Sequence, residues 1–270
     1  TRKIGLEIIL RNKNATIYAA YPNETWPGAA KVITSRIHII KGEWLGNRSL
    51  SGKSISSISA FLSEGSGEWS PKQLECNSGQ TFQGSITLGD GFTLSKSNAK
   101  AMISLDPKNK DVLFPYLGGK ELNGPPEKMN DRWVINFFDW PIEKAQAYLE
   151  PFDHILINVK PGRLAKKDKN VSSYPWWQHL RQRSELYHAI GRGNTFQKHP
   201  AGNKSPSIAF DKILCTAQVS KYFNPRLVKN NAIFSAKTVV FTSQSFSDLA
   251  ILNSSVIQAW IWKHSGRMQK

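Results

Sequence analysis

Short strand patterns and short helix patterns alternate irregularly along this chain, and this irregular order constrains the fold more than any other feature. Thr16–Ala20 and Val32–Ile40 are rich in β-forming residues and flank turn residues, which predicts an antiparallel strand pair. Further strand patterns lie at Ile55–Phe61, Phe82–Leu88, Trp133–Phe138, Lys212–Val219 and Thr238–Thr242. Because no regular βαβ order appears, we expect an α+β fold, a mixed domain with antiparallel sheets and several helices.

The helix patterns are short and have recognisable ends. They lie at Ser97–Leu105, after Pro141, at Phe152–Val159 and at Glu185–Ile190. The last one begins at Ser245, which forms a capping-box pattern with Asp248. Apolar residues follow at helical spacing as far as Trp260, so we expect one long amphipathic helix there.

Composition indicates a folded, soluble protein. Hydrophobic residues make up 40% of the 270 residues and charged residues 21%, which lies outside the range typical of disorder. No apolar stretch approaches the roughly 20 residues of a membrane-spanning helix, and no signal-peptide core follows the start. Cys76 and Cys215 are too few for a disulfide framework or a zinc site, so we expect a reducing, cytoplasmic setting. The absence of an initiator methionine suggests a piece of a longer polypeptide.

The positive charge is concentrated in one part of the chain. The formal net charge is +16, from 36 Lys and Arg against 20 Asp and Glu. Residues 1–150 carry a net charge of +3, whereas residues 151–230 carry +10. An excess of this size favours binding to the phosphates of a nucleic acid, with a generic basic surface as the alternative.

Motifs of common enzyme chemistries are missing from the sequence. It has no phosphate-binding glycine loop with Lys-Ser/Thr, no Gly-x-Ser-x-Gly and no His-Glu-x-x-His, so we assign no catalytic and no metal-binding residue. Asp153 and Lys160 resemble part of a metal-dependent nuclease core, but Asn158 stands where that core has its second acid. An ordinary helix explains the segment better, and a nuclease remains an alternative.

One cluster combines aromatic and basic residues. Tyr174-Pro-Trp-Trp-Gln178 is followed closely by Arg181 and Arg183. Aromatic rings stack on bases, Gln can pair with adenine and Arg with guanine in the major groove. We expect one of the two tryptophans to be buried. The candidate groove contacts are Gln178, Arg181, Arg183 and Lys198, and the candidate phosphate contacts are Arg163, Lys166, Lys167, Lys204, Lys221 and Arg226. Trp177 is a further candidate DNA contact.

The order of several strings resembles a known family. These strings are Gln83-Gly-Ser, Gly91-Phe-Thr-Leu, Asp106-Pro-Lys-Asn, Val112 to Asn123, Arg132-Trp-Val-Ile-Asn-Phe, Trp176-Trp-Gln with Arg181, and Leu249 to Ser255 with Trp260. Together they span most of residues 80–262. They resemble the C-terminal target-recognition region, of the Taq specificity type, of type IIG and related phage-defence adenine-N6 DNA methyltransferases.

The resemblance implies a division of the chain and a function. Residues 1–45 would be the closing strands of an upstream methyltransferase domain, 46–80 a connecting segment, and 81–270 a domain that reads double-stranded DNA. Catalysis, with S-adenosylmethionine as the cofactor, would belong to the upstream domain, whose motifs are missing here. The expected partners are double-stranded DNA and that domain, with no membrane. An RNA-binding or protein-binding domain is the other alternative.

Overall fold

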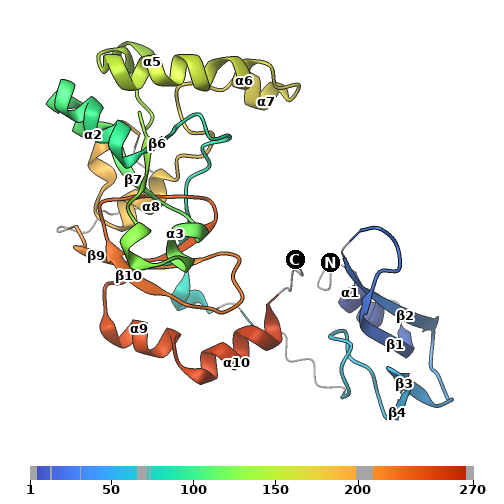
Figure 1. Ribbon diagram of the computed structural model, residues 1–270. Coiled ribbons are helices and arrows are strands. Elements are labelled where there is room, and N and C mark those ends of the chain that lie inside the picture. Colours follow the sequence, from blue (N-terminus) through green and yellow to red (C-terminus); the bar gives the residue numbers. More distant parts are fainter. Residues whose placement is uncertain are drawn as a thin grey trace. The chain divides into compact units, whose positions relative to one another are not determined.

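The chain folds into two compact units in this computed structural model (Figure 1). The structure describes residues 5–12, 14–30, 32–65, 72, 74–198 and 209–265. Unit 1 comprises Thr1–Gln73 with His264–Lys270, and unit 2 comprises Leu74–Lys263. The three-part division expected from the sequence stays a prediction.

Unit 1 is built on the predicted strand pair. Its elements are α1 (Leu6–Asn12), β1 (Ala15–Thr25), β2 (Ile33–Lys41), β3 (Arg48–Leu50) and β4 (Lys53–Ile55). The sheet order is β2-β1-β3-β4, and β1 and β2 are antiparallel, which confirms the prediction. Ile17, Ala20 and Ile58 form its small core. The strand expected at Ile55–Phe61 is wrong, because Ile58 makes only an isolated bridge with Glu64.

Unit 2 contains two four-stranded sheets. One has the order β10-β9-β12-β5 and the other β11-β7-β8-β6. The strands are β5 (Thr81–Gln83), β6 (Thr93–Ser95), β7 (Leu113–Leu117), β8 (Arg132–Ile135), β9 (Lys212–Ala217), β10 (Arg226–Lys229), β11 (Ile233–Phe234) and β12 (Thr238–Phe241). All pairs are antiparallel except β11 with β7, so the expected α+β fold is confirmed.

The two sheets of unit 2 meet where β11 passes into β12. β11 pairs with β7 in one sheet, and β12 pairs with β5 and β9 in the other. Gly84, directly after β5, lies against this junction. A Cβ atom at Gly84 would lie 2.2 Å from the carbonyl oxygen of Ser235, so the close approach requires glycine.

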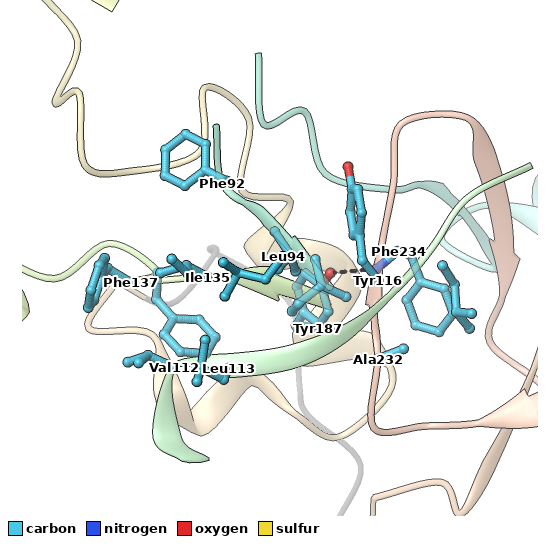
Figure 2. Close-up of a cluster of buried hydrophobic side chains, with 14 of the residues drawn as sticks. Phe92, Leu94, Val112, Leu113, Tyr116, Ile135, Phe137, Tyr187, Ala232 and Phe234 are labelled. Atoms are coloured by element: carbon cyan, nitrogen blue, oxygen red, sulfur yellow. Dashed lines mark hydrogen bonds between the residues drawn. The ribbon is translucent and has the colours of Figure 1, made fainter. Parts of the chain in front are cut away.

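Tyr187 fixes this junction from inside the core. Its side chain is only 1% exposed. The phenol oxygen accepts a hydrogen bond from the Phe234 N–H at 3.2 Å and lies 3.3 Å from Ser85 Oγ. Figure 2 shows the bond to Phe234 among the buried side chains, which include Phe92, Leu113 and Ile135. Burial raises the pKa of Tyr187, so the phenol stays neutral.

Helices and single turns connect these strands. They are α2 (Lys96–Leu105), α3 (Gly119–Asn123), α4 (Ile142–Gln146), α5 (Leu149–Asn158), α6 (Lys160–Leu164), α7 (Lys169–Ser172), α8 (Ser184–Ala189), α9 (Phe246–Leu252) and α10 (Ser255–His264), with 3-10 turns η1 (Glu75–Asn77), η2 (Pro107–Asp111), η3 (Pro126–Lys128) and η4 (Gly193–Thr195). Ser95 Oγ caps α2 by accepting from the Asn98 N–H, and α2 ends before Asp106 as predicted. No helix among the described residues is long and apolar enough to span a bilayer.

The single long C-terminal helix expected from the sequence is wrong. Two helices, α9 and α10, occupy this segment, and Figure 1 shows them as separate red ribbons. Ser245 does cap α9, as the capping box predicts. The break follows from Asn253, whose side-chain amide donates to the carbonyl oxygens of Leu249 and Pro225. Ser254 then begins a new helix by accepting from the Ile257 N–H.

Replacing Tyr187 with Phe should weaken unit 2. Tyr187→Phe leaves the buried Phe234 N–H without its acceptor, so the free energy of unfolding should fall by about 1–3 kcal/mol. Urea unfolding of the variant and the parent chain measures this. Tyr222→Phe is the matched control, because Tyr222 is 62% exposed and should lose about 0.5 kcal/mol or less. Equal losses in both variants would contradict the role given to Tyr187.

Candidate nucleic-acid interface

The structure places Arg163, a predicted phosphate contact, inside unit 2. The residue lies on α6 and is 2% exposed. Its Nη2 donates to the carbonyl oxygens of Thr87 at 3.0 Å and Gln178 at 3.2 Å. Burial lowers the pKa of its guanidinium. In this arrangement Arg163 braces two loops and lies out of reach of a DNA phosphate.

The tandem tryptophan segment also turns mainly inward. Trp176 is 8% exposed and Trp177 is partly exposed, so the prediction that one of the two is buried is confirmed. The Trp177 indole N–H and the Gln178 amide both donate to the carbonyl oxygen of Trp140, at 2.9 and 2.8 Å. Gln178 Oε1 accepts from Gln182 at 2.8 Å. Gln178, a predicted base reader, is therefore occupied within the protein, and Trp177 offers only part of its surface.

Five of the other predicted contacts are exposed. They are Lys166, Lys167, Arg181, Lys198 and Lys221. Lys166 and Lys167 follow α6, and the Lys221 ammonium lies 5.2 Å from the ring centre of Tyr222. These side chains are available to a partner.

Two predicted arginines are half-buried and already hold contacts. Arg183 donates from Nη2 to Gln83 Oε1 at 2.8 Å and lies 3.7 Å from a carboxylate oxygen of Glu185. Arg226 donates to the carbonyl oxygen of Gly124 at 3.4 Å. The remaining predicted contact, Lys204, lies outside the described residues.

Two adjoining hollows bring together cations that sequence reasoning did not select. Hollow A has a volume of about 430 Å³ and is lined by Lys110, Asp111, Phe114, Trp140, Lys144, Tyr148 and Thr195. Hollow B has a volume of about 680 Å³ and is lined by Lys96, Ile103, Lys110, Leu113, Phe114, Pro115, Asn130, Trp133, Arg192, Lys229, Asn230 and Asn231. Lys110 and Phe114 line both. The sequence signal for this surface is the Lys108-Asn-Lys110 run, which lies in η2 shortly before β7.

Many carboxylates of unit 2 bind groups other than lysine. These bonds run from the Tyr148 hydroxyl to Asp111 at 3.1 Å, from Asn109 Nδ2 to Glu150 at 3.0 Å, and from the backbone N–H groups of Gln197 and Lys198 to Asp139 at 2.8 and 2.7 Å. Between described residues of unit 2, side-chain ion pairs join Arg132 to Glu121 and Arg183 to Glu185 and no others. The lysines around the hollows therefore have no carboxylate partner in the described part of the chain.

The nuclease alternative depended on metal ligands near Asp153. Asp153 is exposed on α5, and the described residues contain no group of three or more His, Cys, Asp and Glu side chains placed to hold a metal ion.

Comparison with known proteins decides the family. The family model of the MmeI target recognition domain matches residues 72–270. The chain belongs to the MmeI target recognition domain family. This match covers unit 2 as far as the end of the chain. No curated protein is significantly similar to the sequence.

A solved structure shares the fold of this family member. It is the type IIL restriction-modification enzyme MmeI in complex with DNA, with a TM-score of 0.68 and 15% sequence identity. The match covers 99% of this chain and 35% of the MmeI chain, so this chain spans about a third of the length of that enzyme. The expected resemblance to a target-recognition region is confirmed.

His179, next to the tandem tryptophans, makes unit 2 sensitive to acid. The imidazole is fully buried, with Nε2 2.9 Å from the Ile135 carbonyl oxygen. Burial, opposed by the hydrogen bond with Ile135 and assisted by the nearby Arg163 charge, lowers its pKa from 6.5 to about 4. Between pH 6.5 and about 4 the unfolded chain therefore binds a proton that the folded chain does not.

Unit 2 should accordingly lose stability as the pH falls through this window. The free energy of unfolding should drop by about 3 kcal/mol between pH 6.5 and 4 through this residue, and should be restored above pH 6.5. Denaturant unfolding of the parent chain and of His179→Gln at a series of pH values measures the difference. The variant should show the shallower decline, and parallel pH profiles would contradict the assignment.

Proposed function

We propose that unit 2 recognises a specific sequence in double-stranded DNA, as the specificity part of a restriction-modification enzyme. Membership of the MmeI target recognition domain family carries this proposal. The cations of unit 2 that have no carboxylate partner among the described residues support it, because such lysines can neutralise phosphates. MmeI itself was solved in complex with DNA.

The finer assignments follow the sequence resemblance. We propose that the parent enzyme is an adenine-N6 DNA methyltransferase of the type IIG or phage-defence kind, acting in the cytoplasm. Its S-adenosylmethionine site and catalytic residues would lie in a methyltransferase domain upstream of this chain, which is the intramolecular partner. MmeI is described as type IIL.

The exposed predicted residues divide into two roles. Arg181 is proposed to read a base edge, because its side chain is exposed and its backbone is held by pairing with Ile86. Lys166, Lys167 and Lys221 are proposed to contact phosphates. Arg183, Lys198 and Arg226 are retained as further DNA contacts.

The two roles predict different binding defects. Arg181→Ala should cost about 1–3 kcal/mol at one base position and relax specificity there, because a single base edge loses its partner. Lys166→Ala and Lys167→Ala should weaken binding to all duplexes similarly and reduce the salt slope by about 1 each. Selection of bound duplexes from a randomised pool, followed by affinity measurements at several salt concentrations, separates these outcomes.

The same selection tests the proposed function itself. The parent chain should bind one selected duplex sequence more tightly than a competitor duplex with the same bases in scrambled order. Tighter binding to structured RNA than to duplex DNA would contradict it, because a reader of the DNA major groove does not fit the deep, narrow groove of A-form RNA. Magnesium-dependent cleavage of a plasmid by the chain would favour the nuclease alternative instead.

A further inference from the structure

We propose that hollows A and B together form the contact for one sugar–phosphate strand of duplex DNA. This inference rests on the proposed function and assigns the main phosphate contact to a surface that combines Lys96 and Lys110 with Arg192 and Lys229 of the late, most basic segment. Hollow B provides most of the evidence. Hollow A adjoins it through the shared residues Lys110 and Phe114.

Among the described residues, the lining of hollow B carries positive charge and no negative charge. Its lining includes four cations, Lys96, Lys110, Arg192 and Lys229, and no carboxylate. None of these cations has an ion pair with a described residue. A concave surface with charge of one sign strengthens the local field and attracts a polyanion. The phosphodiester groups of nucleic acid match this charge.

Arg192 is held in place before any ligand binds. Its Nη1 donates to the carbonyl oxygen of Ala232 at 2.5 Å. Its guanidinium carbon lies 5.7 Å from the ring centre of Phe114 and 5.4 Å from that of Tyr187. Aromatic rings and a carbonyl orient the guanidinium without neutralising its charge. The core that stabilises unit 2 thereby also positions a cation at this surface.

Hollow A adds two more features of a nucleic-acid contact. The Lys144 ammonium lies 3.6 Å from the ring centre of Trp140, which fixes it over an aromatic face. Asp111, the acid among the described residues that line hollow A, accepts a hydrogen bond from the Tyr148 hydroxyl. Burial and the Asp111 charge raise the pKa of Tyr148 to about 12, so the phenol remains a donor to this carboxylate at neutral pH. Hollow A therefore retains more positive than negative charge.

The apolar part of the lining fits the sugars between phosphates. Ile103, Phe114 and Trp133 contribute apolar surface to hollow B beside its cations in the same lining. Deoxyribose rings present apolar C–H groups, whereas a free phosphate ion has none. This combination favours a sugar–phosphate strand over an isolated anion.

The test compares two triple variants with the same change in charge. The hollow variant carries Lys96→Gln, Lys110→Gln and Lys229→Gln, all at exposed positions that the fold tolerates. The control variant carries Lys120→Gln, Lys237→Gln and Lys263→Gln, exposed residues of unit 2 outside both hollows. Arg192 is left unchanged because it contacts the core. The dependence of duplex affinity on salt concentration is measured for each chain.

The hollow variant should have the shallower salt dependence. Each lost phosphate contact reduces the slope by about 0.9, so the hollow variant should lose about 2.7, while the control stays close to the parent chain. An unchanged slope in the hollow variant, or equal losses in both variants, overturns the inference and leaves the proposed function standing. A parent chain that fails to bind duplex DNA overturns the proposed function as well.

A second experiment distinguishes a contact for a DNA strand from a site for free phosphate. Inorganic phosphate replaces chloride at constant ionic strength, and duplex binding is measured again. A strand contact predicts only a general anion effect, a decrease in duplex affinity of similar size in the parent chain and in the hollow variant. Extra displacement of DNA by phosphate from the parent chain, but not from the hollow variant, would identify a free-phosphate site and overturn the inference.

Discussion

Carboxylates in unit 2 bind backbone amides, a phenol and a side-chain amide, and this choice of partners leaves lysines on its surface without a carboxylate partner among the described residues. Asp139 holds the loop after η4 through two backbone N–H groups, and Asp111 holds Tyr148. Each such bond stabilises a connection between elements, and each removes an acid from pairing with lysine. The positive excess itself comes from the composition, and the bonds that the fold needs leave part of it in lysines without a carboxylate partner among the described residues.

The junction of the two sheets helps to position the cations that line the hollows. β11 and β12 belong to different sheets but follow one another closely, and Tyr187 and Gly84 allow the close contact there. Residues of β7, of η4 and of the turn before β11 line hollows A and B. Arg192 links the two regions, because it contacts Tyr187 in the core and lines hollow B. Stability of the core and geometry of the surface are thus coupled through one residue.

Much of this organisation could be predicted from the sequence. The fold class, the first strand pair, α2 and the family were predicted from periodicity, capping residues and characteristic strings. The break between α9 and α10 was not, because Asn253 has a tertiary partner in Pro225 that periodicity does not reveal.

The candidate site was harder to predict than the fold. Charge counted along the chain identified the segment that contains Arg163 and Gln178, yet both turn inward, since nearby carbonyl groups needed donors. Lys96 and Lys110 lie in a half of the chain that is close to neutral, and their importance appears only when the acids of that half are seen bonded elsewhere. The net charge of a segment follows from its composition, whereas the pairing of each lysine with a carboxylate depends on the three-dimensional structure.

Lysine reactivity measured with and without bound duplex tests this account most directly. The chain is treated with an amine-acetylating reagent, and modification of each lysine is quantified by mass spectrometry. The account predicts that Lys96, Lys110 and Lys229 lose reactivity when duplex DNA is bound. Lys120, Lys237 and Lys263 should react as before. Protection of the second set, or equal protection of both sets, would contradict a DNA contact at the hollows.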